Sequence, residues 1–177
     1  EVLVDDLHAK TRSNPDKLGF LAGWDGAGTA LGTRLSWNGE YARLTRFVYT
    51  SFFGAEALAQ GRPLGYPTDP DAHRLTLAVA CDPNEDFQLS LDAERLELGE
   101  SGLDVSFTPG SGSAPDPWTH AGVVETTRAV GAGLRWWPAA GVDVGVHGRY
   151  LRRENADHVA GRTREDGEVS VGVRLTR

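Results

Sequence analysis

The residues best spaced for catalysis lie in the second half of the chain. His147 stands between Asp143 and Arg149, and residues two apart share one face of an extended strand. A hydrolase of the Ser–His–Asp type needs a nucleophile within hydrogen-bond reach of the imidazole, and Ser170 is the candidate. A polar strand face inside a barrel accounts for His147 equally well without catalysis. We therefore expect no catalytic site and no enzymatic activity.

Two pairs of carboxylates invite a similar comparison. Asp92 and Glu94 stand about 7 Å apart along a strand, as in some glycosidases, but every acidic strand face has this spacing. Asp69 and Asp71 offer oxygen atoms to calcium, yet turn formation explains them without a metal. The single Cys81 excludes a zinc site of several cysteines. We expect neither a metal nor a cofactor.

Composition narrows the class of protein further. The 177 residues carry a net charge of -7, which argues against a nucleic-acid partner. No apolar run approaches the ~20 residues that a membrane-spanning helix needs. The 22 glycines and 9 prolines favour many turns. No linker divides the chain, so we expect one domain over residues 1–177.

Period-two alternation is the clearest pattern in the sequence. Val142, Val144 and Val146 would share one face of a strand, with Asp143 and His147 on the other. The same pattern recurs along most of the chain and predicts strands at about 1–7, 17–25, 30–49, 72–82, 85–98, 121–137, 141–153 and 167–176.

The connections between these strands alternate in length. Tight turns rich in Gly, Pro, Asn and Asp are predicted at 25–28, 82–85 and 138–141. Longer connections fall at about 8–16, 50–71, 99–120 and 154–166. Outer-membrane barrels have short periplasmic turns and longer external loops. The predicted fold is an all-β, up-and-down antiparallel transmembrane barrel of about eight strands, or eight strands of a larger barrel.

In a membrane barrel the apolar faces meet lipid and the polar faces line the interior, whereas a soluble lipocalin-like barrel has the reverse order. Aromatic residues near strand ends, such as Trp24 and Trp136, favour the membrane barrel because they suit an interfacial girdle. The polar rows then predict an interior network of Arg34, Glu40, Asp92, Glu94, Arg135, Asp143, His147, Arg149, Glu168 and Arg174.

One charged residue does not fit the apolar face of the predicted membrane barrel. The alternation puts Arg43 on the apolar face, where it would cost about 2–4 kcal/mol at the bilayer midplane. Either Arg43 lies above the hydrocarbon, or a bulge near residues 38–39 exchanges the faces.

Aromatic residues in the long loops could stack on sugars, and the candidates for polysaccharide contact are Phe52, Phe53, Tyr66 and Trp118. Phe52 and Phe53 could instead pack against the barrel rim.

Several short segments resemble the later strands of Wzi-like capsule-assembly proteins of the bacterial outer membrane. They are Glu1–Leu7, Lys17–Phe20, Leu21–Trp24, Glu40–Arg43, Val48–Thr50 and Pro63–Asp71. The resemblance covers most of residues 1–100 and loosely the later hairpins. Members of that family have many more than eight strands, so the chain would be a C-terminal portion or a shortened relative, with further barrel strands or other membrane proteins as partners.

The resemblance implies an outer-membrane barrel with a non-enzymatic surface role, in attachment or assembly of capsular polysaccharide. Its partners would be outer-membrane lipid and a surface polysaccharide. Two alternatives remain open: a small structural or adhesive outer-membrane barrel, and a soluble lipocalin-like binder of an apolar ligand. The ending Leu175–Arg177 departs from the aromatic last residue that is usual in outer-membrane barrels.

Overall fold

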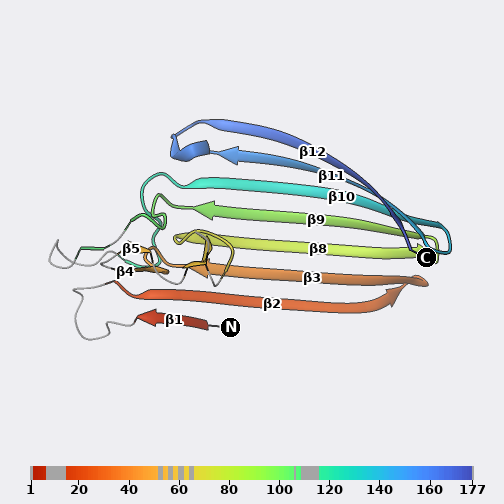
Figure 1. The fold of residues 1–177 in the computed structure, drawn as a ribbon, viewed down its shortest axis with the longest axis horizontal. Helices are drawn as coiled ribbons and strands as arrows, with labels where there is room; N and C mark the ends of the chain where they lie inside the picture. The colour runs from red at the N-terminus through yellow and green to blue at the C-terminus, as the bar shows by residue number, and fades with distance from the viewer. Residues whose placement is uncertain are drawn as a thin grey trace.

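The computed structural model describes residues 2–6, 15–51, 54–55, 58–59, 62–63, 66–105, 107–108 and 116–176. One eight-stranded antiparallel sheet dominates the structure (Figure 1). The strands follow chain order: β1 (Val2–Asp6), β2 (Lys17–Ala30), β3 (Thr33–Leu44), β8 (Ala72–Asn84), β9 (Phe87–Leu98), β10 (Glu125–Ala139), β11 (Val142–Glu154) and β12 (Thr163–Leu175). The prediction of an all-β, up-and-down antiparallel architecture is confirmed.

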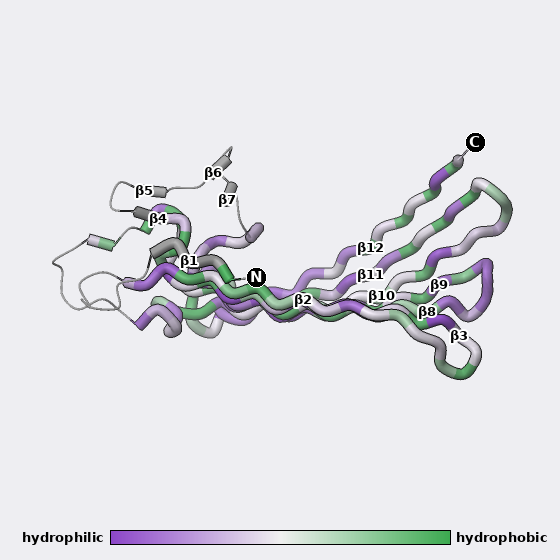
Figure 2. The backbone as a smooth tube through the Cα atoms, turned by 90° about the horizontal axis from the view of Figure 1, so that it is seen from below, coloured by the Kyte–Doolittle hydropathy of each residue, from purple (hydrophilic) through white to green (hydrophobic). Residues whose placement is uncertain are grey.

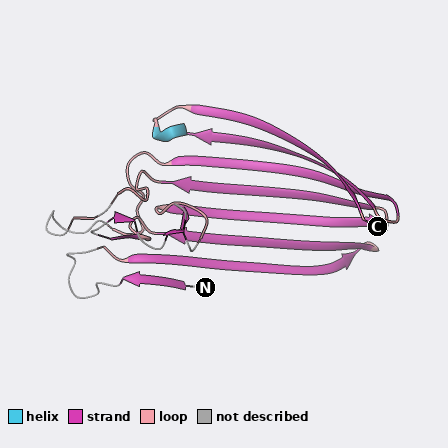
Figure 3. Ribbon diagram, viewed as in Figure 1, coloured by secondary structure: helices cyan, strands magenta, loops and turns pink. Residues whose placement is uncertain are grey.

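The connection from β3 to β8 contains two small ladders. They pair β4 (Thr50–Ser51) with β5 (Gly54–Ala55) and β6 (Leu58–Ala59) with β7 (Arg62–Pro63). The helical element drawn in Figure 3 is η1 (Ala156–His158), a single short turn between β11 and β12. Within the described ranges, no helix is long and apolar enough to cross a membrane.

Two-residue turns join β2 to β3, β8 to β9 and β10 to β11, and the other connections are long, so the predicted alternation is confirmed. The first turn is formed by Leu31 and Gly32, whose φ angles of 52° and 78° suit a type I′ hairpin. The tight turn predicted at 25–28 is wrong, because these residues lie inside β2. The ring of Trp37 covers Gly26 and Gly28 from β3 and supplies the side-chain packing that the glycines lack.

The strand predicted at 30–49 also extends too far, because β3 ends at Leu44. The chain turns at Thr45, whose hydroxyl accepts a hydrogen bond from the Leu18 amide at 2.8 Å and whose carbonyl accepts one from the Asp71 amide at 3.2 Å. Residues 47–49 therefore leave the sheet face. Val48 and Tyr49 pack with Leu44 and Ala72 in a buried cluster at the loop end of the sheet.

The two faces of the sheet differ in chemistry, as the alternating colours along the strands in Figure 2 indicate. Large apolar side chains on one face remain exposed over the central and last strands. They include Leu77, Val79, Leu89, Leu91, Val130, Leu134, Val146, Val169, Val171, Val173 and Leu175. Val171 and Val173 are 70% and 65% exposed, so the valine rows do not pack into a dry interior.

The sheet is open in this structure. Among the described residues, β1 pairs with β2 alone and β12 with β11 alone, and no ladder joins β12 to β1. β1 covers only the loop-side part of β2, from Lys17 to Phe20. The structure therefore supports the strand order of an up-and-down barrel without showing its closure.

Candidate functional site

On the polar face, a hydrogen bond joins side chains of β9 and β11 across the intervening strand β10. His147 on β11 and Asp92 on β9 flank β10, and Nε2 of His147 lies 2.8 Å from Oδ1 of Asp92. Gly131 and Gly133 on β10 lie between them in register. A Cβ atom at Gly131 would come within 2.4 Å of the Asp92 carboxylate, and one at Gly133 within 3.1 Å of the imidazole. The two glycines therefore make the contact possible.

Charged pairs extend this contact toward β3. Arg149 donates to Glu94 from Nη2, and Glu94 Oε1 accepts from Nε of Arg74 at 2.9 Å. The Nε atom of Arg149 lies 3.9 Å from Asp92 Oδ2, is buried and has no hydrogen-bond partner. Opposite charges are thus paired from β8 to β11 on the face to which the sequence analysis assigned Asp92, Glu94, His147 and Arg149.

Tyr66 ends this network at its β3 side. Its hydroxyl donates to Glu40 Oε1 at 2.6 Å and accepts from Arg74 Nη1 at 3.4 Å. Burial, reinforced by the hydrogen bond to Glu40, raises the pKa of Tyr66 to about 12. The side chain of Tyr66, near the end of the β3–β8 connection, thus contacts the polar face and covers part of it.

The remaining predicted members lie nearer the turns or the last strand. Arg135 donates to Asp143 at 2.8 Å on the same face. Arg34, Glu168 and Arg174 are exposed there, and register places them opposite Asp82, Arg149 and Asp143 respectively. The prediction missed Arg74, although its position next to the row beginning at Leu75 assigns it to the polar face.

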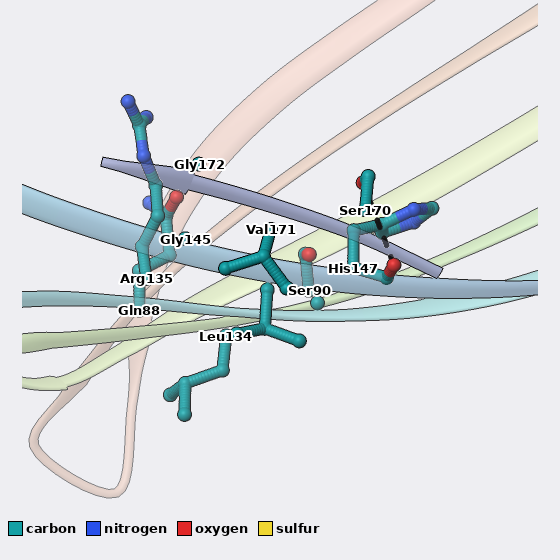
Figure 4. Close-up of a pocket in the computed structure, with 11 residues that line it drawn as sticks. Gln88, Ser90, Leu134, Arg135, Gly145, His147, Ser170, Val171 and Gly172 are labelled. Carbon is teal, nitrogen blue, oxygen red and sulfur yellow. Dashed lines mark hydrogen bonds between the residues drawn. The ribbon is translucent and has the colours of Figure 1, made fainter. Parts of the chain in front are cut away.

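A hollow of about 350 Å³ adjoins His147 and is lined by Ser90, Arg135 and Ser170 with the glycines of β10, β11 and β12 (Figure 4). The hydroxyl of Ser170 donates to the backbone carbonyl of His147 at 3.5 Å, while the imidazole bonds Asp92. Ser170 is therefore not hydrogen-bonded to the imidazole as a nucleophile would be. Within the described ranges, no group of three or more His, Cys, Asp or Glu residues could hold a metal ion.

Arg43 lies at the loop end of β3. The structure distinguishes the two explanations for its place on the apolar face, a position beyond the apolar residues or a bulge near residues 38–39. The β2–β3 and β3–β8 ladders run without a register shift, so the bulge near residues 38–39 is wrong. Arg43 is 8% exposed as a residue, and its guanidinium donates to the carbonyl of Trp118, with Nη1 2.7 Å from His120 Nε2. Arg43 thus lies beyond the exposed apolar positions of its strand.

The four candidates for sugar contact have different surroundings. Phe52 and Phe53 lie outside the described residues. Tyr66 uses its hydroxyl in the polar network, whereas Trp118 is 55% exposed in the connection between β9 and β10. Trp118 therefore remains the better placed of the two described candidates.

The apolar face ends along a common line. Moving toward the loops, each strand from β3 to β12 changes from apolar to charged or polar, at Arg43, His73, Arg95, Arg128, Arg152 and Glu165. Neighbours in this series are paired in register, except that His73 lies opposite Glu97 and Arg95 lies opposite Leu75. On β2 and β3 two tryptophans lie over glycines of the opposite strand, Trp24 over Gly39 and Trp37 over Gly26. The face is thus an apolar band with a charged border.

The chain has no significant match among protein-family models, curated proteins or solved structures.

Proposed function

We propose that the chain forms the wall of an outer-membrane β-barrel, with its apolar face in lipid and its polar network inside. The apolar band supports this assignment most directly. Its positions run from Phe87 to Ala93 on β9 and from Val142 to Tyr150 on β11. At 3.4 Å per residue these stretches measure about 20 and 27 Å along the strands, or about 16 and 21 Å in height at a strand tilt of about 40°. Outer-membrane barrels carry an apolar band about 25 Å tall on tilted strands.

The polar face is partly covered and the apolar face is exposed, which favours a membrane barrel over a soluble lipocalin-like binder. In the soluble fold the apolar face would be the interior. Here the β3–β8 connection packs on the polar face through Tyr66, whereas Leu91 and Val171 on the other face are 65% and 70% exposed. The pairing of Glu94 with Arg74 and Arg149 would let this face be enclosed without leaving these charges unpaired.

We also propose a non-enzymatic role at the cell surface, in attachment of capsular polysaccharide. Its support is the resemblance of several segments to Wzi-like proteins, together with an exposed aromatic residue, Trp118, at the loop end. The alternative of a purely structural or adhesive barrel shares the same fold and membrane location.

Two experiments test these proposals in turn. The urea-unfolded chain is diluted into phosphatidylcholine vesicles and centrifuged on a density gradient; flotation with the vesicles after an alkaline wash supports the membrane wall. A chain that stays in the aqueous fraction overturns it and favours the soluble binder. For the surface role, deletion of the gene should release capsule from the cells, and unchanged cell-bound capsule overturns the attachment role.

A further inference from the structure

A second cavity lies on the apolar face, where that face meets the loops. It measures about 610 Å³, and its lining includes Phe20, Tyr41, Arg43, His73, Glu97 and Trp118. Strand alternation places the first five on the same face as Leu77 and Leu91, one or two steps closer to the loops than the level of Leu77. A molecule in this cavity would therefore sit on the outer side of the sheet, above the apolar band and apart from the interior network.

The polar side of the cavity is held in place by the loops. Asp71 is fully buried; its carboxylate lies 2.9 Å from Nδ1 of His120 and accepts the Ala121 amide at 2.8 Å. His120 in turn contacts Arg43. A guanidinium has five N–H donors, and the contacts of Arg43 with His120 and the Trp118 carbonyl use two of them, which leaves donors for a ligand.

Acceptors and aromatic surfaces complete the lining. Glu97 accepts from Arg95 and lies 3.0 Å from Nδ1 of His73, so a carboxylate and an imidazole stand beside the guanidinium. The Tyr41 ring packs edge-on against Phe20 and His73, with centroids 6.0 and 5.0 Å apart.

The Trp118 side of the cavity is fixed by a local turn. The Trp118 amide donates to Asp116 Oδ1 at 3.0 Å, and the Thr119 hydroxyl donates to Oδ2 of the same carboxylate at 3.0 Å. The hydrogen bond from the Trp118 amide, with that from Thr119, holds the pKa of Asp116 below its usual value. Trp118 is thus an exposed ring on an ordered turn beside the cavity.

We propose that this cavity binds the sugar headgroup of a membrane glycolipid, whose acyl chains lie down the apolar band below Tyr41 and His73. The inference rests on the proposed membrane location. Mixed donors and acceptors beside aromatic rings match the hydroxyl groups and apolar faces of a sugar, and clefts with a few polar groups among aromatic side chains are typical ligand sites. The position at the charged border matches the depth of a lipid headgroup, where aromatic residues also concentrate.

Lipopolysaccharide serves as the probe, since it joins phosphorylated sugars to acyl chains. Radiolabelled lipopolysaccharide is titrated against the full chain in a phosphocholine detergent, and retention on the immobilised protein gives the dissociation constant. Trp118→Ala and His73→Gln should each weaken binding about tenfold, as expected for loss of an anchoring contact. Trp136→Ala is the matched control, because Trp136 is 42% exposed on the same face near the turns, and its affinity should stay within about twofold.

The outcomes separate this inference from the proposed function. Equal affinities for wild type, Trp118→Ala and His73→Gln overturn the glycolipid site, and so does an equal loss in Trp136→Ala. Deacylated saccharide should compete, but more weakly than the intact lipid; failure to compete shows that the headgroup is not recognised and overturns the site. A chain that floats with vesicles but fails these tests keeps its membrane role, whereas a chain that does not float loses both.

Discussion

Replacing Leu91 with arginine measures directly whether the apolar face lies in lipid. Leu91 is in the middle of the apolar stretch of β9, four residues from Phe87 and four from Arg95. At about 3.4 Å per residue and a strand tilt of about 40°, its side chain lies roughly 10 Å from either border of the band. Arginine near the midplane of an outer-membrane barrel costs about 2–4 kcal/mol, which would lower the insertion equilibrium roughly 30- to 700-fold.

The turn between β2 and β3 supplies the matched control. Leu31 is completely exposed there, at 105% of the reference area, and Leu91 is 65% exposed. If both residues faced water, arginine at either site would change stability by less than about 0.5 kcal/mol. Urea titrations in phosphatidylcholine vesicles, followed by tryptophan fluorescence, should show the large loss for Leu91→Arg alone. Equal and small effects of the two substitutions would refute the lipid-facing assignment.

Two further substitutions test the polar face. Gly131→Ala should destabilise the chain by about 1–3 kcal/mol, because the new Cβ meets the Asp92 carboxylate; Gly148→Ala, where nothing lies within 4 Å, should be neutral in the same urea titration, and equal effects would contradict the role of Gly131. Tyr66→Phe should cost about 1 kcal/mol through the lost hydrogen bonds. Since the pKa of Tyr66 is raised from 10.0 to about 12, the stability that its neutral hydroxyl contributes is present below pH 10 and lost as the pH rises through 12. In an absorbance titration, the tyrosinate signal that appears near pH 12 should decrease by one residue in Tyr66→Phe; an unchanged signal at that pH would contradict the buried contact.

Much of the sheet was predictable because alternation records which residues share a face. The rows around Val142 and Leu89 give β11 and β9 to within two residues at each end. The same alternation assigned Asp92, Glu94, His147 and their neighbours to one face, and the structure brings those three into contact with partners there. Side chains on the same face of adjacent strands lie close together, so the alternation in a single sequence is enough to predict which residues share a face.

The errors arose where distant contacts decide the local structure. Glycines at 26 and 28 suggested a turn, but the Trp37 side chain lies over them and keeps them in β2. The end of β3 depends on Thr45 contacting Leu18 and Asp71. The hydrogen bond between His147 and Asp92 requires small residues on the strand between them. This requirement could not be predicted before the structure showed that β10 separates β9 from β11.

The reciprocal Trp–Gly pairs of the first long hairpin have a consequence for strand alignment. Trp24 lies opposite Gly39, and Gly26 lies opposite Trp37. A slip of two residues is the smallest that preserves the identity of the faces. In one direction it would set the two indole rings against each other, and in the other it would leave two glycines facing with no ring above them. Only the native alignment gives each indole a glycine backbone to lie on, so the hairpin carries a determinant of its register within its own two strands.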